Sequence, residues 1–353
     1  GIPRIDYSDD ANGALLLEPQ GTNLFTYSED LSNAVWSKSL TTIIADDSIS
    51  PDGTLNADKI TKSGAYGNVY SSTSITSGVF YVVSFFVKKG TTDFIGVRQA
   101  SGGNDIRKNL NITTGVVTDG GSSGVGFQFL TIEDFNADWK RVKFLCISDG
   151  ISFFSGIYAG QIGNTTYDGD TYIWGMQLEQ FGSATSYIKT VGTAQTRVAD
   201  TCSQTVPSGI IGQSEGTVFL DFKPQTLDAT SRYLSIENSS SSSNGWMGIF
   251  AALSSGDIRF RFYGDGWDFN STLIVEKDTR YKIAFSYKNG VQTSVYVNGN
   301  LIGNITASLS GKSFQKTRLS EAAFGSRGDA EFKSLQVYTT ALSDAELTIL
   351  TTI

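Results

Sequence analysis

The stretch of residues 259–270, RFRFYGDGWDFN, gathers the residue types that bind sugars. An aromatic ring offers a flat apolar face to a sugar, and neighbouring carboxylates and amides supply planar hydrogen-bonding partners for its hydroxyls. We predict a glycan-binding site formed by Trp246, Tyr263, Asp265, Trp267, Asp268 and Asn270. The alternative is that Trp267 fills the end of a sandwich and Asp265 shapes a turn, because large aromatic side chains are usually at least half buried.

Three further aromatic residues, Trp36, Tyr66 and Tyr70, form a candidate for a second sugar-binding face. Trp139 and Trp174 instead lie inside apolar, strand-like runs. Such runs are typical of buried strands, so we expect these two rings to belong to the core.

Carboxylate pairs are the minimum requirement for glycoside hydrolysis, which holds two of them about 5–9.5 Å apart. The nearest pairs in the sequence are Glu276 with Asp278 and Asp329 with Glu331. Charged residues at turns are usually solvated, and the first pair precedes an expected hairpin. We therefore expect no catalytic site, with a glycosidase kept as an alternative.

The chain contains no histidine. This excludes Ser-His-Asp and Cys-His catalysis and the common histidine-based metal sites. Asp46, Asp47 and Asp52 could donate oxygens to Ca²⁺, but the D-x-D-x-D-G spacing of an EF-hand loop is missing. Shaping of the Pro-Asp-Gly turn is the favoured role for these aspartates. We expect no cofactor, and the sequence leaves the question of a bound metal open.

Composition points to an antiparallel all-β protein of more than one domain. The 353 residues are 18% charged, with 38 Gly, 22 Phe and 15 Tyr. Many short aromatic and β-branched runs alternate with Gly, Asn, Asp and Ser, as in all-β folds. The net charge is −8, so nucleic acid and anionic membranes, which attract basic patches, are poor partners.

The cysteines, the apolar runs and the first residue of the sequence bear on where the protein is made and on whether the chain is a fragment. Cys146 and Cys202 are expected to be separate thiols, as in a protein made in a reducing compartment. No apolar run of about 20 residues is present, so membrane insertion is not expected. The sequence starts at Gly1, and we expect a fragment or a processed product.

The first unit is expected over residues 24–191. Residues 78–88, GVFYVVSFFVK, are apolar on both faces and predict a strand at the centre of a sheet. Residues 139–147 and 171–178 predict two more strands, and residues 57–60 begin another. Residues 192–213 are polar, contain Pro207 and Gly209, and are expected to form a linker.

The second unit is expected over residues 214–353. Residues 216–222 and 281–287 alternate with a period of two, and Asn289-Gly290 and Asn298-Gly299 mark hairpin turns. Near the end, Ser343 and Glu346 form an S-x-x-E capping box, which predicts the start of a short helix. Residues 1–23 are expected to form an extended segment. Four clustered residues in it, Ala14 to Leu17, need a burial partner in the following domain or in another copy.

Several of these stretches resemble known families. Residues 4–38, with "LLLEP", "TNL", "SEDL" and a following tryptophan, resemble the opening segment of bacteriophage tail-fibre and virion structural modules. The runs "YVVSFFVKKG", "DWKRV" and "GDTYIWGMQLEQFGSATSYI" resemble a carbohydrate-binding-module jelly roll, with Lys189 where a proline is usual. Residues 281–303 and 334–350 resemble the laminin-G or concanavalin-A-like jelly roll. Glycosidases of that fold carry a third acid that both carboxylate pairs above lack.

The resemblance implies a fold and a function. The fold is all-β, with two tandem antiparallel jelly-roll β-sandwiches, an extended N-terminal segment and a short C-terminal helix. The function is that of a tail-fibre (receptor-binding) fragment in the virion. It would attach, without cleavage, to bacterial surface polysaccharide (capsule or lipopolysaccharide) outside the host cell, as a homotrimer joined to other tail components. The alternatives are a capsular depolymerase, a purely structural fibre spacer and a non-viral bacterial adhesin, because the fold hosts all such roles.

Overall fold

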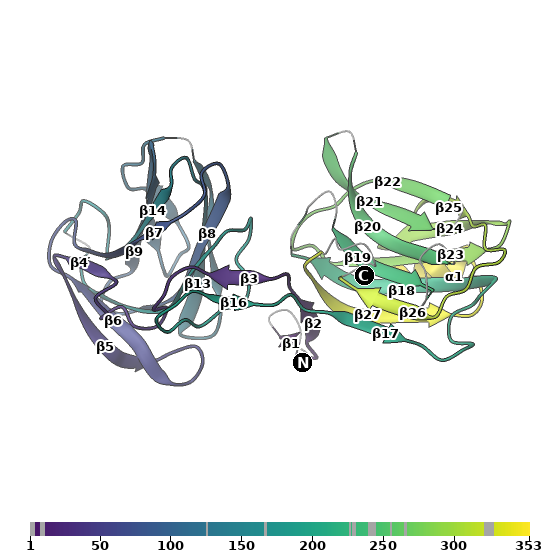
Figure 1. Ribbon diagram of the computed structural model, residues 1–353, viewed down its shortest axis with the longest axis horizontal. Coiled ribbons are helices and arrows are strands. Elements are labelled where there is room, and N and C mark those ends of the chain that lie inside the picture. The colour runs from purple at the N-terminus through teal and green to yellow at the C-terminus, as the bar shows by residue number, and fades with distance from the viewer. Residues whose placement is uncertain are drawn as a thin grey trace. The chain divides into compact units, whose positions relative to one another are not determined.

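The computed structural model describes residues 4–7, 11–124, 126–165, 168–225, 227, 231–238, 245–254, 256–264, 267–320 and 328–353 (Figure 1). The chain forms two compact units. Residues 20–198 make up the first unit, here called the first sandwich. Residues 1–19 and 199–353 together make up the other, here called the second sandwich.

The first sandwich contains two six-stranded antiparallel sheets. One has the order β11-β10-β9-β14-β7-β4, with bounds Val117–Asp119, Asn104–Asn111, Phe94–Ser101, Ser152–Ala159, Asn68–Ser74 and Ser37–Ser39. The other has the order β12-β13-β8-β15-β6-β5, with bounds Phe127–Asp134, Trp139–Ile147, Phe80–Lys89, Asp170–Glu179, Leu55–Lys62 and Thr41–Ile49. A further pair joins β3 (Gly21–Asn23) to β16 (Gln195–Arg197).

Strand β8 lies between β13 and β15, which confirms the central position predicted from its two apolar faces. Val83 and Phe85 point into the main core of the first sandwich. Phe86, on the opposite face, packs with Trp139 and Trp174 in a smaller cluster. Both tryptophans are buried, as expected from their places in apolar strands.

The second sandwich pairs a seven-stranded sheet with a six-stranded one. The seven-stranded order is β1-β2-β27-β18-β23-β24-β25, with bounds Arg4–Asp6, Ala14–Leu17, Ala330–Tyr338, Glu215–Pro224, Tyr281–Lys288, Gln292–Val297 and Asn300–Thr306. The six-stranded order is β17-β26-β19-β20-β21-β22, with bounds Cys202–Thr205, Lys316–Leu319, Arg232–Glu237, Trp246–Ser254, Asp257–Gly264 and Trp267–Ile274.

The core of the second sandwich lies between these two sheets. Phe222 and Phe285 come from the seven-stranded sheet, and Phe260 and Ile249 meet them from the six-stranded one. The hairpins predicted at Asn289-Gly290 and Asn298-Gly299 join β23 to β24 and β24 to β25. Asn298 and Gly299 both have positive φ, 49° and 78°, which is the geometry that an Asn-Gly turn supplies at low cost.

Helix α1 (Asp344–Thr351) covers part of the outer face of the seven-stranded sheet. Leu347 packs there against Phe219 and Tyr296. The predicted capping box is confirmed: the Ser343 side chain accepts from the Glu346 N–H, and the Glu346 carboxylate accepts from Ser343. No helix in the described part of the chain has the length and apolar character that a bilayer crossing requires.

The N-terminal aliphatic cluster is part of the second sandwich. Strand β2 pairs with β27, which places Leu17 in the core with 4% of its surface exposed. Arg4 forms ion pairs with Glu18 and Asp200, and the Glu18 N–H donates to Asp200 at 2.9 Å. Residues 4–6 and 14–17 thus add two strands to one side of the sheet, with β1 outermost, within the extended segment expected over residues 1–23.

The stretch predicted as a linker, residues 192–213, also carries sheet structure. Strand β16 pairs with β3 in the first sandwich, and β17 pairs with β26 in the second. Its polar composition reflects strands at sheet edges, which have few buried side chains and therefore show no apolar period in the sequence.

Candidate functional site

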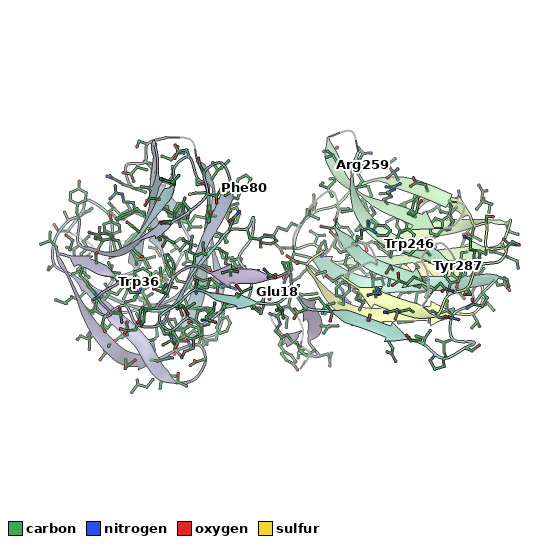
Figure 2. The ribbon with its side chains drawn as sticks, in the orientation of Figure 1. Glu18, Trp36, Phe80, Trp246, Arg259 and Tyr287 are labelled. Carbon is green, nitrogen blue, oxygen red and sulfur yellow. The ribbon has the colours of Figure 1, made fainter. Side chains whose placement is uncertain are left out.

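The predicted sugar-binding residues gather on strands β20, β21 and β22 of the six-stranded sheet. Met247, Ile249, Phe260 and Phe262 point into the core, so the alternate residues of β20 and β21 point outward. Trp246 and Tyr263 share that outer face, with ring centroids 5.0 Å apart at an interplanar angle of 61°. Figure 2 shows Trp246 and Arg259 among the side chains of this sandwich.

A third ring, Phe250, completes an aromatic cluster that sequence reasoning did not identify. Gly248 lies between Trp246 and Phe250 on β20, directly opposite Tyr263. The Phe250 ring lies over this glycine, since a Cβ there would come within 2.9 Å of it. The rings of Trp246 and Phe250 therefore stack at a centroid distance of 5.0 Å.

Exposure differs among these three rings. Trp246 and Phe250 are 8% and 7% exposed, whereas Tyr263 is 40% exposed. The first two therefore form a rigid base, and Tyr263 offers the accessible ring. An exposed, pre-positioned aromatic side chain is the element that a sugar ring would stack on.

Asp268 holds an arginine beside Tyr263. The Arg261 guanidinium donates to both carboxylate oxygens of Asp268, at 2.8 and 2.6 Å, and lies 5.0 Å from the Tyr263 ring centroid. This hydrogen-bonded pair raises the pKa of Arg261 and lowers the pKa of Asp268, so both stay charged near neutral pH. Asn270 is exposed and pairs with Arg261 across β21 and β22.

One of the predicted residues, Trp267, leaves this face. Trp267 is 7% exposed and packs in the core, 5.5 Å from Phe285, because it lies opposite the inward-facing Gly264. A Cβ on Gly264 would come within 2.5 Å of the indole, so glycine makes room for the ring. This corrects the assignment of Trp267 as a sugar platform. Asp265 lies outside the described residues.

Arginines on the outer face are the second feature that sequence reasoning missed. Arg232 on β19 lies 5.0 Å over the Phe250 ring, and Arg259 on β21 forms an ion pair with Asp257 at 3.3 Å. Residues 259–263 read RFRFY, so a strict period of two indicates that Arg259, Arg261 and Tyr263 share one face. Arg232 could not be found this way, because its place depends on the register between β19 and β20.

The carboxylates considered for hydrolysis have structural or solvent-facing roles. Glu331 is 4% exposed, forms an ion pair with Lys223 at 3.0 Å and accepts from Gln225. Burial raises its pKa, and the bond from Lys223 opposes that rise. Glu276 and Asp278 are exposed. The neighbouring Arg280 donates to both carboxylate oxygens of the buried Asp221.

Of the aspartates considered for calcium, Asp52 shapes a turn, and Asp46 and Asp47 lie in strand β5. Asp52 accepts hydrogen bonds from Ser50 and Thr54 around the Pro-Asp-Gly turn. Asp46 has a φ of 54°, and its N–H donates to Asp58. Among the described residues, no group of three or more His, Cys, Asp or Glu could hold a metal ion. Cys146 and Cys202 are free thiols, and burial raises the pKa of Cys146 to about 12.

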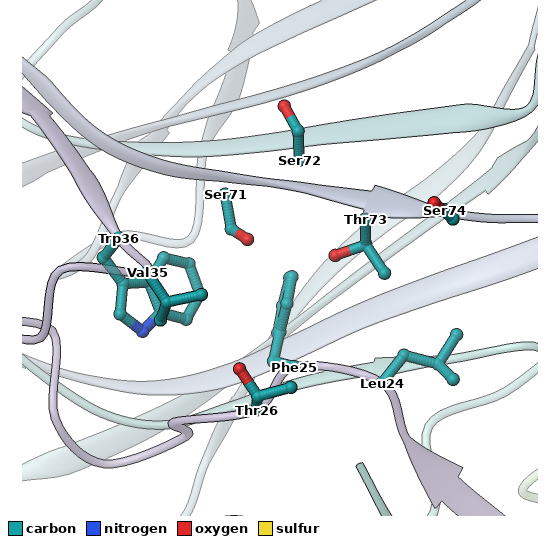
Figure 3. Close-up of a pocket in the computed structure, with 9 residues that line it drawn as sticks. All are labelled: Leu24, Phe25, Thr26, Val35, Trp36, Ser71, Ser72, Thr73 and Ser74. Carbon is teal, nitrogen blue, oxygen red and sulfur yellow. The ribbon is translucent and has the colours of Figure 1, made fainter. Parts of the chain in front are cut away.

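A pocket of about 220 Å³ opens in the first sandwich, beside strand β7 (Figure 3). Strand β4 pairs only with residues 68–70 of β7, so residues 71–74 have no strand partner on that side in the described chain. Figure 3 shows the rings of Phe25 and Trp36 across from the hydroxyl side chains of β7. The described lining is uncharged and includes no exposed aromatic ring.

The predicted second sugar face does not form as one surface. Trp36 is 2% exposed, and its indole N–H donates to the Tyr27 carbonyl at 2.8 Å. Tyr70 stacks on Phe154 at 4.8 Å, on the outer side of its sheet. Tyr66 is 60% exposed and does not line the pocket. The second sandwich therefore holds the stronger candidate.

Comparison with known proteins identifies the fold of the second sandwich. A family described as the "Concanavalin A-like lectin/glucanases superfamily" matches residues 199–348. The chain thus has an all-β jelly-roll architecture with a concanavalin-A-like second sandwich. No curated protein sequence matches the chain.

The similar solved structures have low sequence identity to this chain and low TM-scores. The heptameric SAP-like pentraxin from Limulus polyphemus is 18% identical, with 38% of this chain and 68% of that chain covered and a TM-score of 0.31. The CBM40 of Ruminococcus gnavus IT-sialidase, bound to alpha2,3 sialyllactose, is 17% identical, with coverages of 40% and 84% and a TM-score of 0.33. Domain 4 of the arabinanase AbnA from Geobacillus stearothermophilus, in complex with arabinotriose, is 17% identical, with coverages of 42% and 71% and a TM-score of 0.34.

Proposed function

We propose that this chain binds carbohydrate without cleaving it, through the outer face of the six-stranded sheet in the second sandwich. The observation that carries this proposal is the exposed Tyr263 ring, held against the buried ring of Trp246 at 5.0 Å and flanked by Arg261, Asp268 and Asn270. An accessible ring beside fixed hydrogen-bonding groups matches what a sugar presents, namely an apolar ring face edged by hydroxyls.

The biological setting proposed is attachment of a bacteriophage tail fibre to bacterial surface polysaccharide. The support is the resemblance of residues 4–38 and of the jelly-roll motifs to tail-fibre modules. In this setting the chain belongs to the virion, assembles as a homotrimer and acts outside the host cell. Several weak sites on one fibre would then raise avidity without any new contact.

Non-catalytic binding is favoured over hydrolysis by the state of the acidic residues. Glu331 is neutralised by Lys223, and Asp268 is held in a bidentate pair with Arg261. A general acid needs a protonatable carboxyl facing the glycosidic oxygen, and an arginine pair at Asp268 works against that protonation. A reducing-sugar assay on bound polysaccharide separates the two functions, since any turnover lost in Glu331→Gln would establish a depolymerase.

Replacing Tyr263 by alanine is expected to weaken polysaccharide binding about tenfold, because the variant loses the accessible stacking surface. Isothermal titration or a glycan array on the intact chain measures the change. The fold should persist, since Tyr263 is on the outer face and Phe260 and Phe262 of the same strand hold the core.

Tyr7→Ala is the matched control. Tyr7 is also an exposed tyrosine of the second sandwich, at 63%, but it follows the edge strand β1 of the other sheet. Its removal should leave the affinity within a factor of two. If both variants bind like the wild type while the wild type binds glycan, the binding face lies elsewhere. If the wild type binds no glycan, a structural spacer replaces the proposed function.

A further inference from the structure

We propose that the open half of strand β7 in the first sandwich binds an extended, uncharged peptide segment of another protein, which adds to the sheet as a further strand. The site lies at the pocket of Figure 3 and involves none of the residues of the proposed carbohydrate-binding face. Backbone hydrogen-bonding groups along this half of β7 are the basis of the proposal.

One edge of β7 is only half occupied. On one side, β7 pairs with β14 as far as Ser74. On the other side, β4 pairs only with residues 68–70. Residues 71–74 therefore form a strand edge with no partner strand in the described chain. An exposed strand edge is a template for pairing with another polypeptide.

The register shows which backbone groups face this open edge. Directly after β7, the Ile75 N–H donates to the Ile151 carbonyl at 3.0 Å, in line with the pairing of β7 and β14. Ile75 and Ile151 are thus a hydrogen-bonded pair, and such pairs alternate along an antiparallel ladder. Thr73 therefore turns its N–H and C=O groups toward β14, whereas Ser72 and Ser74 turn theirs toward the open edge.

The groups of these two serines are accessible to a partner. Within the part of the chain that the structure describes, no hydrogen bond reaches the N–H or C=O of Ser72 or Ser74 from the open side. Both residues are exposed. A partner residue opposite each serine would accept from its N–H and donate to its C=O. Such main-chain bonds are the source of affinity when a peptide adds to a sheet edge.

The pocket determines which side chains the added strand can carry. Its volume is about 220 Å³, and its described lining contains no charged residue. Figure 3 shows the side chains of Ser71 and Thr73 pointing toward the pocket and Ser72 pointing away, with the rings of Phe25 and Trp36 on the far side. Side chains that lie opposite one another in a ladder share a face. Every second side chain of the partner would therefore enter the pocket, which favours small apolar residues at those positions.

Two other occupants fit this edge less well. Every strand of the described chain already belongs to one of its own sheets. An edge strand from a second copy would keep its inward side chains in the core of its own sandwich and leave the pocket unfilled. A sugar is disfavoured because the described lining has no exposed aromatic ring and no carboxylate or amide side chain. An uncommitted, extended segment of another protein meets both requirements.

The test measures binding of three seven-residue peptides with blocked ends to the intact chain by isothermal titration. Serine alternates with alanine, valine or leucine in these peptides, so the apolar residues can enter the pocket. We expect binding, and N-methylation of all serines should weaken it at least tenfold, because it removes the N–H groups that bond to β7. N-methylation of all apolar residues is the matched control. Their N–H groups point away from β7, so the affinity should stay within a factor of about three.

Ser72→Pro should weaken peptide binding at least tenfold, because proline has no N–H to donate. The fold should persist, since proline is tolerated on strand edges where the N–H side faces outward. Ser72→Ala is the control, because it keeps the N–H and changes only a side chain that points away from the pocket. Its affinity should stay within a factor of about two. The methylated peptides are measured on the unaltered protein, so they decide the matter even if Ser72→Pro misfolds.

Four outcomes would overturn the proposal. The first two are failure of all three peptides to bind, and an equal loss from the two sets of methyl groups. Self-association of the intact chain that Ser72→Pro abolishes in sedimentation would assign the edge to a second copy. Glycan binding that Ser72→Pro abolishes and Tyr263→Ala leaves intact would assign the pocket to a sugar. Peptide binding without any glycan binding would leave this inference standing while the proposed function failed.

Discussion

Replacing Asn23 by alanine is expected to destabilise the first sandwich by about 4 kcal/mol or more, since it leaves four buried backbone groups without partners. Asn23 has no exposed surface. Its side-chain amide donates to the carbonyls of Met176 and Ile188, at 3.0 and 2.9 Å. Its carbonyl oxygen accepts from the N–H groups of Phe25 and Leu178, both at 3.1 Å.

This residue joins three segments that are far apart in the sequence. The side chain connects β3 to β15 and to the stretch around Ile188. A shorter apolar side chain cannot replace any of the four bonds, and the site is too enclosed for water to reach all of them readily. The loss of stability in Asn23→Ala should therefore exceed the loss caused by a cavity alone at the same place.

Urea unfolding followed by hydrogen–deuterium exchange measures this effect for residues 20–198 separately from the rest of the chain. Thr22→Ala is the matched control. Thr22 is next to Asn23 in the sequence, but its side chain is only half buried and forms one hydrogen bond, with the Thr196 hydroxyl at 2.8 Å. We expect that control to cost less than about 1 kcal/mol. A similarly small loss in Asn23→Ala would mean that the four hydrogen bonds are not a major source of stability.

The most recognisable motifs in the sequence owe their form to buried hydrogen bonding. Asn23 belongs to "TNL", and Gln177 and Glu179 belong to "GMQLEQ". Gln177 accepts from the Ile188 N–H at 2.7 Å, and Glu179 accepts from the N–H of Thr185 at 2.9 Å. Such motifs were reliable for predicting the fold because their side chains bond backbone N–H and C=O groups that need a partner in this fold. They carry little information about the ligand.

The alternation of residues within strands predicted strands of the sheets, whereas the candidate site was predicted from residue types. Tyr263 and Trp267 were both assigned to the candidate site from their residue types alone, although Trp267 packs inward. Asp265-Gly266 is a two-residue hairpin signal, and such a loop pairs Gly264 with Trp267 on one face. Applying that rule to this stretch would have placed Trp267 in the core.

Residues brought in from other strands could not be predicted in this way. Phe250 and Arg232 reach the face through the register of β20 and β19, which includes an irregularity between Arg232 and Leu234. A single such shift changes which side chains lie opposite one another. The place of β2 in its sheet was unpredictable for a related reason, because its partner β27 lies more than three hundred residues away in the sequence.

Asp58 is expected to make the stability of the first sandwich fall by about 3 kcal/mol as the pH rises from about 3 to about 7. Its side chain has no exposed surface and accepts from the N–H groups of Leu31 and Asp46, at 2.6 and 3.1 Å. Burial raises the pKa of Asp58 from 3.8 to about 6; the two N–H donors oppose the rise, and the nearby Asp30 and Asp46 carboxylates add to it.

The sign follows from which state binds the proton more tightly. Because the pKa is higher in the folded protein, protonation favours folding, and this contribution is fully present below about pH 3.8. It is lost as the pH rises through about 6, where the folded protein must hold a charged carboxylate in its interior. Carboxylates with lowered pKa values act in the opposite direction, so the wild-type profile alone does not isolate Asp58.

The Asp58→Asn variant isolates the contribution of Asp58 to the pH dependence, because asparagine does not titrate and keeps one acceptor oxygen for the two N–H groups. Denaturant unfolding at a series of pH values should show the variant gaining about 3 kcal/mol in stability relative to the wild type between about pH 3 and pH 7. Asp52→Asn is the control: hydrogen bonds from Ser50 and Thr54 lower the pKa of Asp52 despite partial burial. The difference in stability between Asp52→Asn and the wild type should therefore stay level above about pH 5.

Parallel curves of stability against pH for Asp58→Asn and the wild type would mean that Asp58 is ionised in the folded protein without cost. Its two N–H donors would then outweigh its burial, and the link from Leu31 to β6 would be as strong at neutral pH as in acid.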